Sequence, residues 1–393
     1  MFSPEPSRPS PVTALLRFPG PGDSGERLPR WRLLRDPVRV VTAHTGSQVV
    51  PALAEVEAAV AGGLYAAGFV AYEAAPAFDP ALVTHPAGEW PLLWFALFTE
   101  FEELDDLPGP AGSFRLGTWT PDGSEEGHAA AIAEIRRQIA GGNTYQVNHT
   151  LRLRAPFAGD DLALFAALSR AQPTRYSAYL NAGRWRVLSA SPELFFSVSG
   201  GEVLTRPMKG TAPRGATPQE DAARAAALRA SPKERAENLM IVDLLRNDLG
   251  RVARFGTVSV PRLFEIETHP TLHTMTSTVR AELRPGTRLA DLFGALFPCG
   301  SVTGAPKVST MRLIRALETS PRGVYCGAVG HLSPEGEMAF NVPIRTVTLD
   351  MARGEAEYGV GSGVTWDSTP GGEYAEVLTK AAVVRGLVGR GGQ

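Results

Sequence analysis

Lys209 stands where one reactive amine could be held in place. It follows Pro207 by two residues and directly precedes Gly210, within the segment 205–215 that also contains two arginines. Proline restricts the backbone, and glycine permits a tight turn. A lysine that is desolvated or close to other cations can act as a nucleophile. The segment therefore predicts a turn that presents Lys209, with an ordinary surface turn as the alternative.

Two pairs of glutamates share one spacing. Glu234 and Glu237 lie three residues apart on one predicted helix, and Glu373 and Glu376 lie three apart at the start of another. This spacing puts the two carboxylates of a pair on one helix face. Four carboxylates in one cavity would repel each other unless a cation lay among them, and Mg²⁺ prefers oxygen ligands. The pairs indicate a magnesium site, with solvated helix faces as the alternative.

Glycine and arginine residues supply candidate anion-binding groups. Glycines at 359, 361 and 363 follow a predicted strand, where backbone N–H groups can approach a carboxylate or phosphate. Arg345 closes an apolar run and offers a planar fork for a carboxylate. The loop Phe297–Lys307 is glycine-rich but lacks the Gly-Lys-Ser/Thr ending of a nucleotide-binding loop. We therefore exclude a nucleoside triphosphatase.

Two further side chains keep two interpretations each. His273 fits an acid–base group or a hydrogen-bonded core histidine, and the second is the commoner case. Cys299 fits a packed thiol better than a nucleophile. The chain has one other cysteine, Cys326, so no disulfide framework is expected, and a reducing, cytoplasmic location fits.

The composition describes a chain that can bury a sizeable core. Its 393 residues are 44% apolar and 20% charged, with a formal net charge of −2. This balance gives no indication of binding to nucleic acid or to an anionic membrane. We also expect no signal peptide and no membrane-spanning segment.

The elements that must position these residues form three predicted regions. Residues 1–30 are rich in Pro, Gly and Ser and are expected to be loose. Residues 31–125 are expected to form an N-terminal subdomain and a linker, and residues 126–393 the catalytic domain. Strands and helices alternate with short hairpin-like connections, which predicts an α+β fold of antiparallel sheets covered by helices. One helix is expected to start at Ser231–Pro232, a capping residue followed by proline.

Five segments together resemble the signatures of the chorismate-utilising enzymes. In chain order they are Glu237–Asp248, Gly300–Lys307, Tyr325–Gly330, Ile344–Thr346 and Glu373–Glu376. The family includes component I of anthranilate synthase and of aminodeoxychorismate synthase, isochorismate synthase and salicylate synthase. The resemblance covers residues from about 126 to 388 and implies antiparallel β-sheets packed as a sandwich with helices on the outside. Residues 68–75 look like the matching region of aminodeoxychorismate synthases.

The resemblance also implies roles for individual residues. Glu237 and Glu376 match the Mg²⁺ ligands, and Glu234 and Glu373 match carboxylates that support the metal. His273 matches a histidine near the leaving or migrating group. Glu193 matches a carboxylate that acts as a general acid–base group on the ring hydroxyl. Residues expected to bind the substrate are Gln146, Thr303, Tyr325, Arg345, Gly361, Gly363 and Lys380.

Two positions separate the branches of the family. Gln146 stands where isochorismate and salicylate synthases carry a lysine that activates water, so ammonia is favoured over water as the nucleophile. Lys209 stands where anthranilate synthases carry alanine. The resemblance therefore favours aminodeoxychorismate synthase component I, which forms 4-amino-4-deoxychorismate for p-aminobenzoate and folate biosynthesis through a covalent lysine intermediate. Ammonia is expected from a separate glutamine amidotransferase subunit. The alternatives are anthranilate synthase component I and a non-catalytic chorismate-binding relative.

Overall fold

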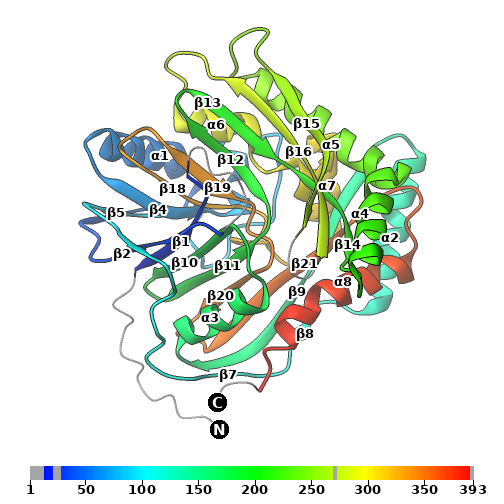
Figure 1. Cartoon of the computed structure of the whole chain (residues 1–393), viewed down its shortest axis with the longest axis horizontal. Coiled ribbons are helices and arrows are strands. Elements are labelled where there is room, and N and C mark those ends of the chain that lie inside the picture. Colours follow the sequence, from blue (N-terminus) through cyan, green and yellow to red (C-terminus); the bar gives the residue numbers. More distant parts are fainter. Residues whose placement is uncertain (1–12, 21–27, 269–271, 390–393) are drawn as a thin grey trace.

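Two large antiparallel sheets form the centre of the molecule (Figure 1). The computed structural model describes residues 13–20, 28–268 and 272–389. The strands of the first sheet, in spatial order, are β17 (Gly304–Ala305), β9 (Gln146–Gly159), β21 (Glu355–Val364), β20 (Thr346–Asp350), β11 (Trp185–Ser191), β10 (Tyr176–Ala182), β1 (Ala14–Arg17), β2 (Trp31–Leu34) and β6 (Glu102–Leu104), with β7 (Phe114–Leu116) and β8 (Thr120–Pro121) paired to β9.

The second sheet is built in the same way. Its strands, in spatial order, are β14 (Met208–Pro213), β16 (Leu272–Glu282), β13 (Glu202–Arg206), β12 (Leu194–Ser199), β19 (Met338–Asn341), β18 (Ala328–Leu332), β4 (Tyr65–Val70), β5 (Leu93–Phe98) and β3 (Arg39–Ala43), with β15 (Ser259–Thr268) paired to β16. The helices are α1 (Gly46–Ala61), α2 (Glu125–Ala140), α3 (Asp161–Ala171), α4 (Pro218–Ala230), α5 (Pro232–Gly250), α6 (Leu289–Leu296), α7 (Lys307–Leu317) and α8 (Pro370–Arg385), with 3₁₀ turns η1 (Tyr72–Ala77) and η2 (Gly300–Val302).

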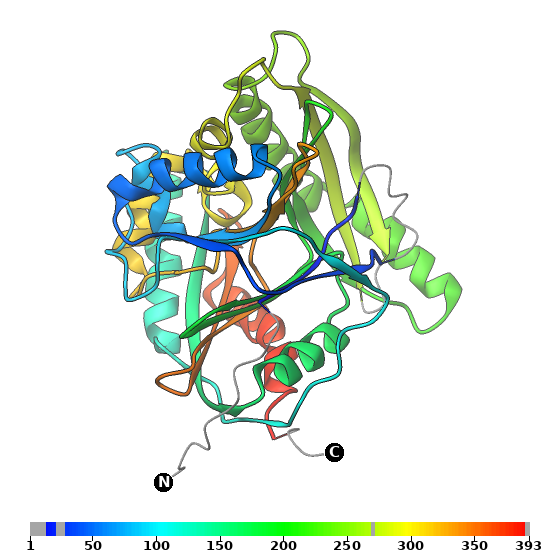
Figure 2. The ribbon, with the colours of Figure 1, turned by 90° about the vertical axis from the view of Figure 1, so that its left-hand side faces the viewer.

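Three apolar layers show how the sheets and helices pack. One layer lies between the two sheets and joins residues such as Leu16 of the first to Phe69 of the second. A second packs α1, α5 and α6 on the outer face of the second sheet. A third packs α3 and α8 on the first sheet, and Figure 2 shows α1 and α8 on opposite sides of the strands. The predicted α+β sandwich with helices outside is confirmed.

The side chains of β10 explain how one strand serves two layers. Tyr176, Ala178 and Leu180 point into the layer between the sheets, while Tyr179 belongs to the layer under α3. Successive side chains of a strand point to opposite faces, so an apolar strand of this kind is covered on both. Burial of each large apolar side chain contributes about 1.5–3 kcal/mol.

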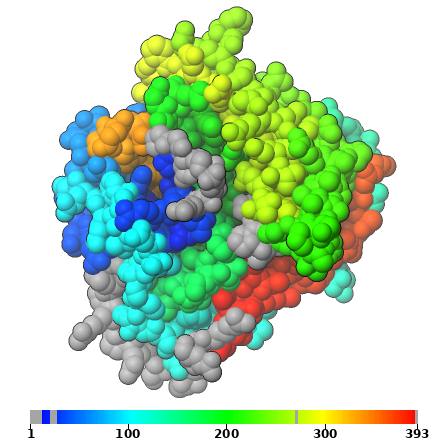
Figure 3. Space-filling view, viewed as in Figure 1, coloured from blue at the N-terminus to red at the C-terminus, as the bar shows by residue number. Residues whose placement is uncertain are grey.

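Strands from the N-terminal part enter both sheets. Residues 1–12 and 21–27 of the segment expected to be loose lie outside the described residues, but Ala14–Arg17 forms β1, an interior strand between β10 and β2. Strand β4 pairs with β18 in the second sheet. Figure 3 shows the same arrangement at the surface, where the β18–β19 hairpin lies among N-terminal residues. Both sheets thus contain strands from before and after the predicted boundary at residue 125.

Helix α5 begins where the sequence predicts. The side chain of Ser231 accepts a hydrogen bond from the backbone N–H of Glu234, and Pro232 occupies the first helical position. Serine satisfies a free N–H of the first turn, and proline has no N–H to leave unpaired. None of the helices in the described part of the chain is long and apolar enough to cross a lipid bilayer.

A buried charge cluster joins β9 to the end of α7. Glu318 binds Arg152 at 2.9 Å and Arg322 at 2.7 Å, and the three side chains are each 1% exposed. Glu318 also accepts hydrogen bonds from the backbone and the hydroxyl of Thr150. Burial alone would raise the pKa of Glu318, but the two arginines outweigh it and lower that pKa to about 2.

We predict that Glu318→Gln lowers the free energy of unfolding by about 3–5 kcal/mol, because it leaves two buried guanidinium groups without their carboxylate. Since the pKa is depressed from 4.5 in the folded protein, the stabilisation is present above pH 4.5 and is lost as the pH falls toward 2. Urea unfolding at several pH values should show the two proteins converging below pH 4.5. Glu134→Gln, which breaks an exposed pair with Arg137, is the control and should have a much smaller effect.

Candidate active site

Lys209 lies at a β-bulge of β14 and not in the predicted turn. Met208 pairs with Thr276 of β16, but Thr211 pairs with Thr274, so β14 has one extra residue between these pairs. Bulges bend a strand and re-aim a side chain. Gly210 completes the bulge with a φ of +88°, a conformation that favours glycine.

The amine of Lys209 reaches across to the first sheet. Its Nζ lies 3.5 Å from the carbonyl oxygen of Ser301 in η2. A Cβ atom added to Gly363 would lie 3.2 Å from this Nζ and 2.5 Å from Nε2 of Gln146. Glycine at this position of β21 therefore makes room for both side chains. The amide oxygen of Gln146 is buried and has no hydrogen-bond partner in the described structure.

Glu193 lies buried beside the same amine. Burial raises its pKa to about 7, while a hydrogen bond from the Ser301 side chain and the positive charges of Lys209 and Lys380 oppose the shift. One of its carboxylate oxygens, Oε1, is buried without a described partner. A carboxyl group with this pKa can donate or accept a proton near neutral pH.

Two of the four glutamates proposed for the metal lie on α5 next to Lys209. Burial and the carboxylates of Glu234 and Glu376 raise the pKa of Glu237, against the opposing charge of Lys209. An oxygen of Glu234 is only 2.8 Å from where a Cβ on Gly210 would be. The glycine thus supplies both the bulge conformation and the space for this carboxylate.

The other two glutamates lie on α8. Glu376 forms an ion pair of 2.6 Å with Lys380, whose Nζ also donates to the carbonyl of Gly361 at 2.8 Å. The pKa of Lys380 is lowered by burial and by the charges of Arg345 and Lys209, while Glu376 opposes the shift. Glu373 is 7% exposed, and its Oε2 is buried without a described partner.

These carboxylates have the chemistry that a hard divalent cation requires. They are oxygen donors from two helices. Burial, and after it the carboxylates of Glu234 and Glu376, raise the pKa of Glu237, and a bound cation would offset both effects. Within the described ranges, no group of three or more His, Cys, Asp or Glu side chains is close enough to hold a metal ion as it stands. The residues fit the cation by donor type, with Glu376 turned to Lys380 instead.

Two predicted substrate-binding residues, Arg345 and Tyr325, lie at or next to a residue with a positive φ. Arg345 has a φ of 53° and Cys326, next to Tyr325, a φ of 64°. Such conformations cost about 1–3 kcal/mol in residues other than glycine and cluster at functional sites. The side chain of Arg345 is hydrogen-bonded to Tyr358. The Tyr325 ring packs directly on Gly359, where a Cβ would be 2.3 Å from a ring carbon.

His273 and Thr303 are engaged in other contacts. The ring nitrogens of His273 contact Asp221 at 2.8 Å and Thr268 at 3.0 Å. The hydroxyl of Thr303 donates to the carbonyl of Cys299 at 3.0 Å, inside the loop. His273 is therefore a buried, hydrogen-bonded histidine in this structure, and its catalytic role stays a prediction. The thiol of Cys299 is buried, and burial raises its pKa to about 12, as expected of a packed thiol.

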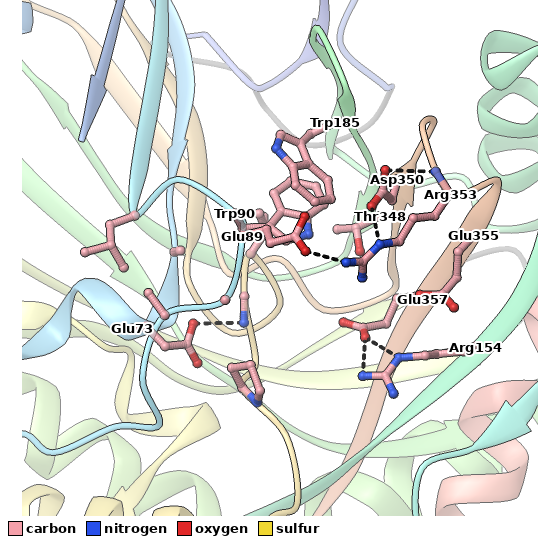
Figure 4. Close-up of a pocket in the computed structure, with 17 residues that line it drawn as sticks. Glu73, Glu89, Trp90, Arg154, Trp185, Thr348, Asp350, Arg353, Glu355 and Glu357 are labelled. Atoms are coloured by element: carbon pink, nitrogen blue, oxygen red, sulfur yellow. Dashed lines mark hydrogen bonds and ion pairs between the residues drawn. The ribbon is translucent and has the colours of Figure 1, made fainter. Parts of the chain in front are cut away.

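Sequence reasoning missed Ser301 and Arg322 as parts of this site. Ser301 contacts both Lys209 and Glu193, and its place in a glycine-rich loop was the available signal. Arg322 is spaced four residues from Glu318, which in sequence looks like an ordinary surface pair. A cavity of about 420 Å³ lies elsewhere: none of the predicted site residues lines it (Figure 4).

Comparisons with known proteins identify the family of this chain. The family model of chorismate binding enzymes matches residues 24–386. Aminodeoxychorismate synthase component 1 of Klebsiella aerogenes is 43% identical over 271 residues, which are 69% of this chain and 60% of that protein. The Escherichia coli K12 protein of the same name is 41% identical, with the same coverage. The chain thus spans about 60% of the length of these two relatives.

Anthranilate synthases are also similar. Component 1 from Methanothermobacter thermautotrophicus is 36% identical over 346 residues, which are 82% of this chain and 73% of that protein. The crystal structure of anthranilate synthase component I from Streptococcus pneumoniae superposes with a TM-score of 0.80 at 26% identity and covers 90% of this chain and 91% of its own. A putative isochorismate synthase from Bacillus anthracis, at 20% identity and a TM-score of 0.76, shares the fold and covers 96% of both chains.

We predict that the carboxyl group of Glu193 titrates near pH 7, as ¹³C NMR of glutamate-labelled protein can measure, with Glu193→Gln to assign the resonance. Lys209→Met should raise this pKa further, because the positive charge of Lys209 lowers it. Lys233→Met removes the charge of an exposed lysine on α5 and should leave the resonance unchanged. A Glu193 that titrates at 4.5 would contradict the buried site described here.

Proposed function

Since the chain belongs to the family of chorismate binding enzymes, we propose that it converts chorismate and ammonia to 4-amino-4-deoxychorismate, as component I of an aminodeoxychorismate synthase. The observation that carries this proposal is the amine of Lys209, which lies beside Gly363 and Glu193. The similarity to aminodeoxychorismate synthases supports it. The product would serve p-aminobenzoate and folate biosynthesis.

The proposed reaction uses Lys209 twice. Its amine, once deprotonated, attacks C2 of chorismate, both double bonds of the ring diene shift, and the hydroxyl at C4 leaves with a proton from Glu193 as water. The extra proton on the Lys209 nitrogen then returns to Glu193. Ammonia attacks C4, both double bonds shift back, and the C2–N bond breaks as a proton of the added ammonia passes to the departing amine of Lys209. The ring keeps its oxidation state, and one direct substitution at C4 is divided into two conjugate ones.

The basic groups of Lys380 and Arg345 suit a dicarboxylate. Lys380, Arg345 and Tyr325 would bind the substrate carboxylates, since Lys380 and Arg345 are close enough for their charges to interact. Gln146, as an amide, cannot act as the base that activates water. Glu237 and Glu376, with Glu234 and Glu373, would hold Mg²⁺, which when bound would neutralise a substrate carboxylate.

Anthranilate synthase component I remains the second candidate. The similarity to the Methanothermobacter thermautotrophicus protein, over 82% of this chain, favours it. Lys209 argues against it, because an amine at this position blocks the approach of ammonia to C2. Product analysis with chorismate, Mg²⁺ and ammonium salt separates the two. Aminodeoxychorismate supports the proposal, anthranilate with pyruvate supports the second candidate, and unchanged chorismate would contradict both. Turnover with glutamine is expected to need a separate amidotransferase subunit.

We predict that Lys209→Ala lowers the rate of 4-amination by at least about 1,000-fold, because it removes the covalent route. In the wild-type protein, intact mass after incubation with chorismate and Mg²⁺, without ammonia, should show an adduct. Only four lysines occur, so peptide mapping can assign the adduct to Lys209. Lys233→Ala should keep it. An undiminished rate in Lys209→Ala would rule the covalent mechanism out.

We also predict that Glu237→Gln and Glu376→Gln each lower turnover by about 100-fold or more, because each removes one ligand of the metal. Excess chelator should have the same effect on the wild-type protein, and Mg²⁺ should restore activity. The melting temperature of metal-free Glu237→Gln should equal or exceed that of the wild type, since the change removes a carboxylate whose charged form is disfavoured by burial and by the neighbouring carboxylates. Glu126→Gln, on the exposed start of α2, is the matched control. Full activity in chelator would contradict the assignment.

A further inference from the structure

Glu73 connects the N-terminal part to a turn near the proposed active site. Its two carboxylate oxygens accept hydrogen bonds from the backbone N–H groups of Arg322 at 2.7 Å and Gly323 at 2.9 Å. The backbone N–H of Tyr72 donates to the carbonyl of Gly323 at 2.8 Å. Three hydrogen bonds therefore attach η1 to a turn about 250 residues away in sequence.

Arg322, at the centre of this turn, holds two further segments. Its guanidinium donates to the carbonyl of Val302 at 2.6 Å and to that of Asn148 at 2.8 Å. The Tyr72 ring lies 4.6 Å from the guanidinium carbon, in cation–π geometry. Val302 belongs to η2, as does Ser301, which contacts Lys209. The position of Arg322 thus fixes η2 and the start of β9.

Tyr325 follows the turn by two residues. Its ring is packed on Gly359 and lies 5.2 Å from the guanidinium carbon of Arg152. The backbone N–H of Gly327 bonds back to the carbonyl of Val324 at 2.9 Å, so the segment after the turn is compact. A shift of the turn at Gly323 would be transmitted directly to Tyr325.

The turn also borders a cavity. The cavity of about 420 Å³ is lined by Pro321, Gly323 and Val324 together with Glu73. Figure 4 shows Glu73 at this cavity with its hydrogen bond to the turn. Side-chain packing does not fill this volume, so the turn has room to move into it. The hydrogen bonds of Glu73 act against that movement.

From this geometry we infer that Glu73 is a positioning residue, which holds the Arg322–Gly323 turn so that Tyr325 and η2 have the arrangement needed to bind the substrate. It does not touch the reacting atoms. The inference rests on the proposed function, because Tyr325 and Ser301 are taken as parts of the chorismate site. It assigns to the N-terminal part a direct influence on that site.

Glu73→Gln is the sharpest test, because glutamine keeps the size of the side chain but turns an amide N–H₂ toward one of the two backbone N–H donors. We expect kcat/KM for chorismate to fall at least tenfold, chiefly through a higher KM. Hydrogen exchange of the backbone at 322–326, measured without substrate, should become at least tenfold faster. Glu357→Gln is the matched control: it removes a carboxylate of the same cavity that is bound to Arg154 and not to the turn.

The control variant should stay within twofold of the wild type in both measurements. Glu73→Asp, a shorter carboxylate, gives the same comparison with smaller changes if Glu73→Gln does not purify as a folded protein. Unchanged exchange at 322–326, or kcat/KM within twofold of the wild type, would overturn the inference. If the wild-type protein forms no aminodeoxychorismate, the proposed function fails, and the exchange comparison still decides whether Glu73 holds the turn.

Discussion

The carboxylate of Glu318 lies between two buried guanidinium groups, and the site is arranged around that constraint. An unpaired buried charge is far more costly than a paired one, so Arg152 and Arg322 must stay within reach of Glu318. Arg152 brings β9, and Arg322 brings the turn before Tyr325 and the carbonyl of η2. One ion cluster therefore fixes three segments that carry proposed site residues: β9, η2 and the turn before Tyr325.

In the proposed active site, positively and negatively charged side chains lie close together. Lys209 and Lys380 lower the pKa of Glu193 against its burial, and the charges of Glu376, Arg345 and Lys209 all act on the pKa of Lys380. Cations and carboxylates here are only partly paired, since Glu193 and Glu373 each keep a buried oxygen without a described partner. A dicarboxylate and a divalent cation would add charges of both signs and complete this balance, as the proposed function requires.

The sequence allowed local features to be predicted better than long-range ones. The pair Ser231–Pro232 correctly predicts the start of α5, because capping depends on residues that are neighbours in sequence. The fold class followed from strand and helix patterns together with the family resemblance. Nothing local indicates that Ala14–Arg17 would pair with β10, or that Glu318 and Arg322 are buried. The bulge at Lys209 could not be predicted from the sequence, because a bulge depends on the register with β16.

The entry of N-terminal strands into both sheets has a consequence for biosynthesis. Strand β4 pairs with β18, whose residues are made roughly 260 positions later, so β4 has an open edge for about 10–50 s at ordinary translation rates. Open edges of this kind favour aggregation. Neither sheet can close before most of the chain has left the ribosome. Folding is thus expected to be largely post-translational, and in a fragment that begins at residue 126 β10 would lose its neighbour β1 and β18 would lose its neighbour β4.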